Sequence, residues 1–423
     1  MQARLCFRRE IRVAFRVASE RIFAQSVEIM PATVIHASRI LTPDEEIGDG
    51  VIVVEGGRIT GLGHRDTMRL PPGSADYVAT GMTVVPGFVD LHIHGAGGHD
   101  VMEANARALD RITSTVARHG TTSIVATTVT APVEDTCRSL EGIARYVRSH
   151  ENSEEHAESN RLAAEILGVH LEGPFISMAR RGVHPPDAIA RPSVEVFNKF
   201  LEASNGLVRI LTLAPELPGA LELIAFAVAA KIVVAMGHTD ADYDQARAAI
   251  HAGARHAVHV YNAMRPFTHR DPGVVGAILT DPEVTAEVIA DLVHVAGPAI
   301  QVLLGAKGFD AVVLVSDGIA ATGMPDGNYR LGTFEVNVKD GVARNAEGKL
   351  AGSTLTLDRA LRNVVALGVP LREAVRMATV LPARRLGLAG KKGIIAVGAD
   401  ADLVALTPDL RVAGVMTRGA GLT

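Results

Sequence analysis

Histidines and carboxylates follow a series of apolar, strand-like runs in this sequence, and their spacing could build a catalytic metal site. His92 and His94 stand two apart at the end of the run Val89–Ile93. Residues two apart on a strand point to the same face, so both imidazoles can reach one ion while Ile93 packs behind them. A single buried histidine is more often structural than a metal ligand. The recurrence of histidines or carboxylates at the ends of several strands is not explained by side-chain packing alone. The residues at these ends are His92 and His94, Glu172, His238, His259, His294 and Asp317.

Three of these side chains form a plausible ligand set for one divalent ion. Glu172 directly follows the apolar run Ile166–Leu171, and His238 and His259 follow similar runs further on. Together they supply one oxygen and two nitrogen ligands and leave a position open for water, as in catalytic rather than structural zinc sites. Zinc, iron, cobalt and manganese all suit such ligands.

Asp317 ends the run Val312–Ser316 and could move protons at such a site. A divalent ion acidifies its water toward neutral pH, and a neighbouring carboxylate can take the proton and pass it to a leaving amine. The other interpretation is a helix N-cap before Gly318. The chemistry at the other strand ends favours the catalytic interpretation.

The elements that must position these groups alternate between apolar runs and Ala-rich amphipathic segments from about Val85 to Gly387. The runs are continuous, as is typical of strands buried on both faces. This alternation predicts an α/β fold, a (β/α)8 TIM-like barrel over residues 86–387, with catalytic groups at the carboxyl ends of the strands. The expected strands are Val89–Ile93, Ser123–Thr128, Ile166–Leu171, Val208–Leu213, Ile232–Ala235, His256–Val260, Thr285–Ile289 and Val312–Val315.

Both ends of the chain have a different pattern. Short β-branched runs are cut by Gly and Asp in residues 30–85 and again in residues 388–423, which indicates hairpins. We expect a small discontinuous β-sandwich domain formed by both chain ends. We interpret the Arg-rich residues 1–29 as a non-native or disordered extension, because three acids and the absence of a clean apolar core with a cleavage site disfavour a targeting peptide.

Composition excludes several classes of protein. The 423 residues carry 42 Lys and Arg against 47 Asp and Glu, a net charge of −5, so nucleic acid is not expected as a partner. Two cysteines, Cys6 and Cys137, cannot build a disulfide framework and fit a cytoplasmic location. No apolar run approaches the roughly 18–20 residues that span a bilayer, so no membrane partner is expected.

A series of stretches lies in order along the chain, at residues 86–90, 170–175, 237–239, 259–264, 291–294, 316–318, 323–327 and 350–353. Together these stretches resemble the N-acetylglucosamine-6-phosphate deacetylases of the amidohydrolase superfamily. The run at residues 398–402 also resembles the returning β domain of that superfamily.

The resemblance implies one or two divalent ions per chain, with zinc the first expectation and iron, cobalt or manganese as alternatives. Glu172, His238 and His259 would hold the main ion, and His92 and His94 a second one. Asp317 matches the acid/base of the family. The implied substrate contacts are Val183, His184, Asn262, Ala263, Arg270, His294, Leu350, Ala351 and Gly352.

Arg270 is the implied phosphate anchor, because a guanidinium fork matches phosphate oxygens. In the family this arginine comes from the neighbouring subunit, so the resemblance also implies a homodimer. Two departures from the family pattern are Leu292, where a small residue is usual, and Gly318, where alanine is usual. Both leave the metal ligands unchanged but could alter the sugar pocket.

The activity implied by the resemblance is hydrolysis of the acetamide of N-acetyl-D-glucosamine 6-phosphate to D-glucosamine 6-phosphate and acetate. A metal-activated water would attack with Asp317 as acid/base, in amino-sugar catabolism. The galactosamine epimer differs at one hydroxyl and stays an open alternative. The His294 and Arg270 stretches favour a phosphorylated substrate over an N-acyl amino acid. The complete ligand set and acid/base disfavour a non-catalytic sugar-phosphate sensor.

Overall fold

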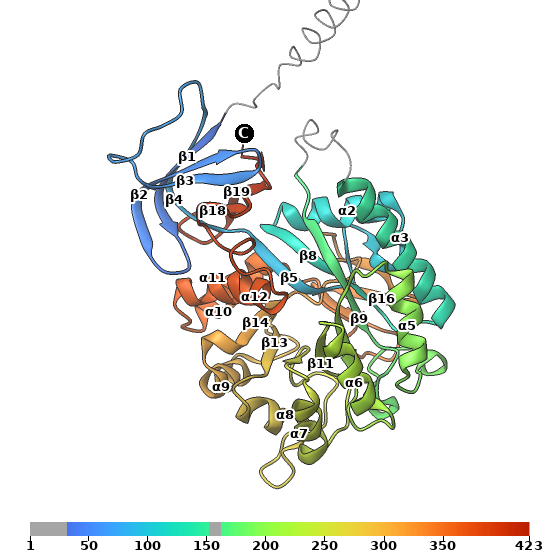
Figure 1. Ribbon diagram of the computed structural model, residues 1–423. Coiled ribbons are helices and arrows are strands. Elements are labelled where there is room, and N and C mark those ends of the chain that lie inside the picture. The colour runs from blue at the N-terminus through green and yellow to red at the C-terminus, as the bar shows by residue number, and fades with distance from the viewer. Residues whose placement is uncertain (1–31, 152–161, 423) are drawn as a thin grey trace, which may run out of the picture.

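A barrel of eight parallel strands forms the centre of the protein, as Figure 1 shows for a computed structural model that describes residues 32–151 and 162–422. Strand order follows the chain, and a bridge between Ile93 and Gly318 brings the first strand against the segment after the last. The extension predicted at residues 1–29 lies outside the described residues. The strands are β5 (Phe88–Ile93), β8 (Thr121–Thr128), β9 (Glu165–Glu172), β10 (Val208–Leu213), β11 (Val233–Met236), β12 (His256–Ala257), β13 (Thr285–Ile289) and β14 (Val312–Val315).

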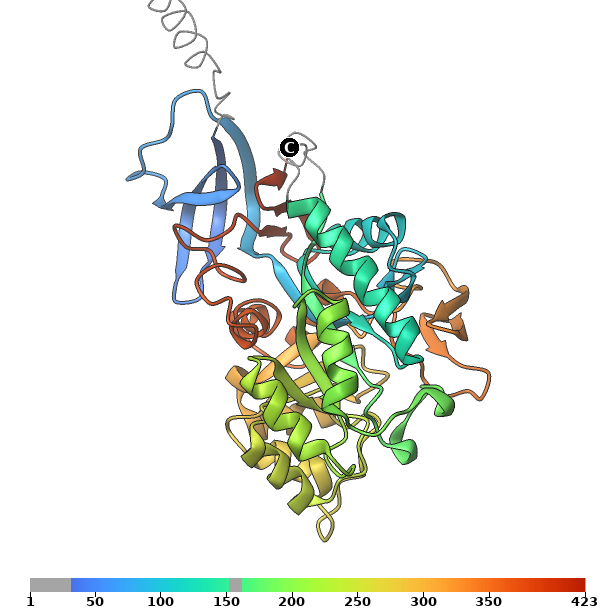
Figure 2. The ribbon, with the colours of Figure 1, turned by 45° about the vertical axis from the view of Figure 1, so that its right-hand side comes forward.

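Helices cover the outside of this barrel (Figures 1 and 2). Their ends follow local capping rules: α7 begins where Asp242 and Gln245 form a capping box, and it ends at Gly253 in the left-handed region with φ 113°. The helices are α2 (Ala106–Ala117), α3 (Val133–Glu151), α5 (Val194–Ala203), α6 (Ala220–Ala229), α7 (Tyr243–Ala252), α8 (Gly273–Thr280), α9 (Gly297–Lys307), α10 (Leu357–Ala366), α11 (Leu371–Ala378) and α12 (Val380–Arg385).

All eight predicted strand runs are confirmed as barrel strands, and most of their residues are buried because helices cover one face and the barrel core the other. One run is shorter than predicted. β12 ends at Ala257 rather than Val260, because the backbone leaves the extended conformation at His259 (φ 27°) and Tyr261 (φ 79°). The last residues of that run therefore belong to a turn that carries part of the site.

Strands from both ends of the chain pair in a second, smaller domain. Its seven strands have the order β20-β19-β18-β4-β1-β2-β3, and residues from both ends share one apolar core. Hydrogen bonding runs continuously through all seven strands, because the long β4 pairs with β1 and also with β18. The strands are β1 (Thr33–Leu41), β2 (Glu46–Glu55), β3 (Arg58–His64), β4 (Ala75–Pro86), β18 (Leu403–Leu406), β19 (Val412–Thr417) and β20 (Ala420–Gly421).

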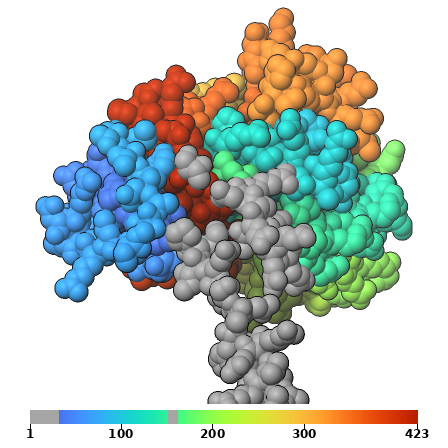
Figure 3. All heavy atoms as spheres, turned by 90° about the horizontal axis from the view of Figure 1, so that it is seen from above, coloured from blue at the N-terminus to red at the C-terminus, as the bar shows by residue number. Residues whose placement is uncertain are grey.

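A buried lysine links the two domains. Lys392 Nζ lies 2.5 Å from Glu165 Oε2, 2.8 Å from Asp402 Oδ2 and 3.0 Å from Asp400 Oδ2. Burial disfavours its charge, but the three carboxylates raise the pKa of Lys392 above its ordinary value. Glu165 opens β9 and Glu172 ends it, so this link lies at the opposite end of the barrel from the strand ends that carry the predicted site. From above, C-terminal residues lie between the first strands and the barrel (Figure 3).

A small three-stranded sheet at the barrel mouth was not predicted. It follows β14 and consists of β15 (Gly327–Leu331), β16 (Phe334–Lys339) and β17 (Val342–Arg344), and a two-stranded hairpin, β6 (Gly95–Ala96) and β7 (His99–Asp100), follows β5. Asp100 Oδ2 accepts a hydrogen bond of 2.8 Å from the backbone N–H of Gly332, which ties the two additions together. Within the described residues, no helix is both long enough and apolar enough to cross a bilayer.

Candidate active site

The carboxylate of Glu172 lies at the centre of the side chains that the barrel gathers at its carboxyl end. Glu172 is only 3% exposed, so this charge needs cationic or hydrogen-bonding neighbours. Histidine Nε2 atoms surround its two oxygens at 2.9–3.5 Å. In order of increasing distance, these nitrogens belong to His259, His238, His94, His92 and His184. The structure therefore brings together the four histidines predicted as ligands, and adds His184 from the predicted substrate contacts.

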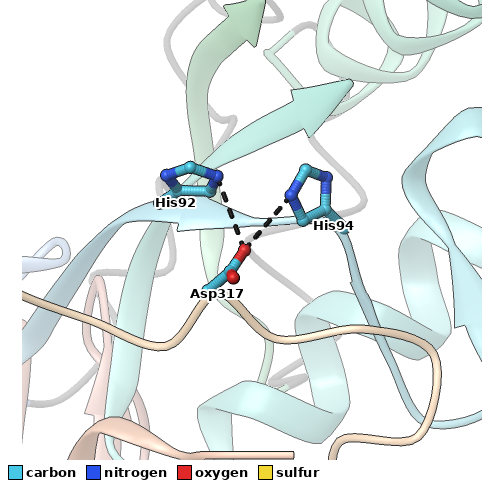
Figure 4. A group of neighbouring side chains, drawn as sticks. All are labelled: His92, His94 and Asp317. Atoms are coloured by element: carbon cyan, nitrogen blue, oxygen red, sulfur yellow. Dashed lines mark ion pairs between the residues drawn. The ribbon is translucent and has the colours of Figure 1, made fainter. Parts of the chain in front are cut away.

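His92, His94 and Asp317 form a second group next to Glu172 (Figure 4). Both imidazoles leave β5 toward the same side, as the two-residue spacing predicted, and Asp317 reaches them from the turn after β14. Asp317 Oδ1 lies 3.3 Å from His94 Nε2 and 3.5 Å from His92 Nε2. Asp317 is therefore close enough to share an ion with these histidines.

The strand ends that carry the site have unusual backbone conformations. His238 (φ 46°), His259 (φ 27°) and Asp317 (φ 47°) all lie in the left-handed region, which costs about 1–3 kcal/mol for each such residue. Hydrogen bonds hold these turns: the N–H of Asp317 donates to the carbonyl of His92 at 2.9 Å, and its own carbonyl accepts from Ser353. The surrounding fold thus fixes the direction in which each side chain leaves its strand.

Hydrogen bonds at Nδ1 fix the tautomers of two predicted ligands. His94 Nδ1 lies 3.2 Å from the carbonyl oxygen of Thr127, and His238 Nδ1 lies 3.0 Å from that of Arg180. A carbonyl can only accept, so both rings carry a proton on Nδ1, and the Nε2 lone pair of a neutral ring faces Glu172. This is the arrangement that metal-ligating histidines adopt.

His184 has the opposite tautomer. Its Nδ1 accepts a hydrogen bond from the backbone N–H of Thr130 at 3.3 Å, and Thr130 Oγ1 lies 2.8 Å away. Burial, and then the charge of His238, lower the pKa of His184 to about 4, so the ring is neutral. The neutral ring must carry its proton on Nε2, which faces the centre of the site. In this tautomer His184 is a hydrogen-bond donor to the site, and its position next to Glu172 and His238 also makes it part of a third group that could hold a metal.

The donor set fits a divalent cation. His92 Nε2 is buried and has no hydrogen-bond partner, although carboxylate oxygens of Glu172 and Asp317 lie 3.3 Å and 3.5 Å away. Burial acts to lower the pKa of His94, but hydrogen bonds with Asp317 and Glu172 outweigh it and raise the pKa to about 9. The buried carboxylates thus favour positive charge among neighbouring nitrogen ligands. His92, His94 and Asp317 form one group that could hold a metal, and His92, Glu172 and His259 form another.

A cavity of about 210 Å³ opens directly onto this centre. Most of the predicted substrate contacts line it: Val183, His184, Asn262, Ala263, His294, Leu350 and Gly352, together with Leu331 from the small sheet. Two predicted contacts do not. The side chain of Ala351 is 1% exposed and packs with Ile319 and Leu331 in a separate apolar cluster. Arg270 is exposed on the loop before α8 and does not line the cavity of its own chain.

His294 lines the cavity wall, where its side chain favours the binding of an anionic group. Its Nδ1 lies 2.6 Å from Asp291 Oδ2, which also accepts a hydrogen bond of 2.9 Å from Ser353 Oγ. Burial acts to lower the pKa of His294, but the hydrogen bond and charge of Asp291 outweigh it and raise the pKa. A protonated His294 can donate from Nε2 to an anion in the cavity.

The sequence analysis missed two buried groups beneath the site, Glu287 and His170. Glu287 lies in the middle of β13 and contacts His92 Nδ1 at 2.9 Å. His170 lies two residues before Glu172, and its Nε2 is 2.7 Å from Thr212 Oγ1. Burial, and then the charge of His92, lower the pKa of His170 to about 3, so this ring is neutral. An acidic residue inside an apolar run was the signal that could have singled out Glu287.

An eight-stranded barrel with a buried histidine and carboxylate centre at the carboxyl ends of its strands defines a metal-dependent hydrolase. The profile of the amidohydrolase family matches residues 83–420. The chain belongs to this family, and its activity as an enzyme that uses a divalent metal follows from that membership and from the ligand groups described above.

Relatives of known activity cover nearly the whole chain. An N-acetylglucosamine-6-phosphate deacetylase of Vibrio furnissii is 39% identical over 389 residues, 90% of this chain and 93% of the relative. An N-acetylgalactosamine-6-phosphate deacetylase of Escherichia coli O157:H7 is 36% identical over 387 residues, 91% of this chain and 98% of the relative. Among solved structures, a mutant N-acetyl-D-glucosamine-6-phosphate deacetylase from Mycobacterium smegmatis in complex with N-acetyl-D-glucosamine 6-phosphate has a TM-score of 0.85 and 40% identity. The match covers 93% of this chain and 100% of the chain in that structure.

Proposed function

We propose that this enzyme hydrolyses the acetamide of N-acetyl-D-glucosamine 6-phosphate to D-glucosamine 6-phosphate and acetate, in amino-sugar catabolism. The observation that carries the proposal is the cavity between His294 and the Glu172 centre, which offers an anion site at one wall and hydrolytic groups at the other. The relatives named above support this substrate. The galactosamine epimer is the second candidate, because one relative is named for it.

In this proposal, Glu172, His238 and His259 hold the main divalent ion, and His92 and His94 contribute to a second position. The bound metal supplies an acidified water molecule and a positive charge for the developing oxyanion. Zinc suits the nitrogen and oxygen ligands, as do iron, cobalt and manganese. The lone pair that His94 and His238 direct toward Glu172 is what each imidazole needs as a ligand.

Asp317 moves the proton in the proposed reaction. Burial acts to raise the pKa of Asp317, but the hydrogen bond with His94 and the charges of His92 and His94 outweigh it and lower the pKa. The ionised carboxylate accepts the proton of the water that attacks the acetamide carbon. It then returns that proton to the sugar nitrogen as the carbon–nitrogen bond breaks. His184 donates its Nε2–H to the acetamide oxygen, where negative charge develops.

The decisive experiment measures acetate release from the gluco and galacto sugar phosphates and from N-acetyl-D-glucosamine without phosphate. We expect the highest kcat/KM for N-acetyl-D-glucosamine 6-phosphate. Loss of the phosphate should raise KM strongly, because His294 then has no anion to bind. A clear preference for the galacto sugar would replace the first candidate by the second, and equal turnover without phosphate would contradict both.

The proposal includes a cytoplasmic homodimer in which Arg270 reaches the active site of the neighbouring subunit. The exposure of Arg270 and its absence from the cavity of its own chain support this role. The other lining residues, Val183, Asn262 and Ala263, with the Leu350–Gly352 loop, would hold the sugar.

A mixed-dimer experiment tests the role of Arg270. Subunits with Arg270→Ala and subunits with Asp317→Asn should each be nearly inactive as pure dimers. Mixed dimers should regain activity, because one site then combines an intact Asp317 with an Arg270 from its partner. Acetate release after the two variants have been mixed and reassembled provides the measurement. Failure of reassembled mixed dimers to regain activity would show that Arg270 does not act across the interface.

A further inference from the structure

The carboxylate of Glu287 lies inside the barrel, away from solvent. Glu287 is fully buried in the middle of β13, where every residue is buried. A charge in such a place costs several kcal/mol unless it is paired and hydrogen-bonded. The groups around Glu287 must therefore offset this free-energy cost, and their identity indicates what the side chain does.

Among the described residues, three groups lie within hydrogen-bond distance of this carboxylate, and each of them can donate a hydrogen bond. His92 Nδ1 lies 2.9 Å from Oε2, and His256 Nε2 lies 2.9 Å from Oε1. The backbone N–H of His259 also donates to Oε2, at 3.3 Å. Glu287 thus holds the side chain of one predicted metal ligand, on β5, and the backbone of another, in the turn after β12.

The contact with His92 determines which nitrogen of that ring faces the site. A carboxylate accepts from Nδ1–H, so the proton of a neutral ring is on Nδ1 and the lone pair is on Nε2. His92 Nε2 is the buried atom without a hydrogen-bond partner that points toward Glu172 and Asp317. The Glu287–His92 pair therefore has the form of the carboxylate–histidine–metal triads found behind metal sites.

We propose that Glu287 is a positioning residue that fixes the tautomer and orientation of His92 and anchors the turn at His259, so that both metal positions depend on one buried carboxylate. This inference takes one point from the proposed function, namely that the site binds metal. His256 has a lesser part, because its ring contacts Glu287 but lies outside the groups that could hold an ion.

The test compares zinc binding to metal-free wild-type protein and variants by competition with a chromophoric chelator. In Glu287→Gln, an amide replaces the acceptor, and its NH2 group can face the Nδ1–H of His92, so the ring is expected to turn or change tautomer. We expect zinc affinity at the position that uses His92 to fall about 10–100-fold, the usual effect of removing such a partner. Zinc affinity at the position that uses His259 should fall less, because glutamine keeps one oxygen that can accept from the backbone N–H of His259. Full occupancy of both positions with wild-type affinity would overturn the proposal.

Two matched variants separate positioning from general damage to the core. His256→Gln alters the same buried network but leaves the Glu287–His92 contact, so zinc affinity should stay near that of the wild type. Glu216→Gln makes the same chemical change next to the site, where Glu216 holds Thr239 and Asp240 rather than an imidazole, and should also keep its affinity. An equal loss in His256→Gln would assign the effect to disruption of the network and reject the positioning role.

Thermal unfolding of the metal-free proteins controls for folding. If Glu287→Gln does not fold, Glu287→Asp keeps the charge on a shorter side chain and should show the same loss of zinc affinity in weaker form. Wild-type affinity in a folded Glu287→Asp would then count against the proposal. Acetate release by the wild-type enzyme is measured separately, so a failure of the proposed substrate is distinguishable from a failure of the role of Glu287.

Discussion

Replacement of Asp317 by asparagine is expected to lower kcat about 10⁴-fold, at the upper end of what general acid–base catalysis contributes. The reason is that one carboxylate performs both proton transfers, and an amide of the same shape can perform neither. The main metal position should stay filled, because Glu172, His238 and His259 do not depend on Asp317. Rates of acetate release and elemental analysis of the purified variant provide the two measurements.

The control for this variant is Asp76→Asn, the same change at an exposed position on β4 in the smaller domain. Its kcat should equal that of the wild type. An Asp317→Asn enzyme with full metal content and a normal rate would remove Asp317 from the mechanism. A variant that loses all metal would instead assign Asp317 mainly to ligation, which its 3.3 Å contact with His94 Nε2 makes geometrically feasible.

The second large effect is expected when both histidines of β5 are removed. In the double variant His92→Ala and His94→Ala, metal content should fall from about two ions per chain to about one, because two of the nitrogen ligands disappear. Turnover should also fall, since His94 contacts both Glu172 and Asp317. Elemental analysis after dialysis against a fixed zinc concentration measures the stoichiometry.

A double variant at His64 and His251, two exposed histidines outside the site, is the matched control and should keep the wild-type stoichiometry. If the β5 variant retained as many ions as the wild type, the site would be mononuclear in spite of its two adjacent imidazoles. A wild-type content of one ion per chain would lead to the same conclusion.

The barrel was predictable because its strands are continuous apolar runs between amphipathic helices, a pattern that sequence alone displays. The small sheet β15–β17 was not predicted, because its strands are short and partly exposed and have no such run. The order in which strands pair in the smaller domain was also not predicted. It depends on β4 pairing with strands on both of its sides, and pairing partners are not visible in local sequence.

The grouping of the predicted metal ligands was predictable from their position at strand ends, where a barrel gathers its side chains. Their tautomers were not, because these depend on contacts with distant parts of the chain, such as the carbonyl of Thr127 for His94 and Glu287 for His92. The same limit applies to Arg270, whose residue type indicates phosphate but which does not line the cavity of its own chain. The sequence therefore indicated which residue types lie in the site. Only the three-dimensional contacts show whether a histidine nitrogen donates a hydrogen bond or offers a lone pair to a metal.

The pairing of β4 with β18 has a consequence for how the polypeptide acquires its structure during synthesis. β4 ends at Pro86 and leads directly into β5, but its partner β18 begins only at Leu403, after every strand of the barrel. One edge of β4 therefore stays open until the ribosome has made the whole barrel, and open strand edges are places where chains associate wrongly. The domain that begins first is completed last, and its closure requires a contact between parts of the chain that are far apart in sequence, which slows folding.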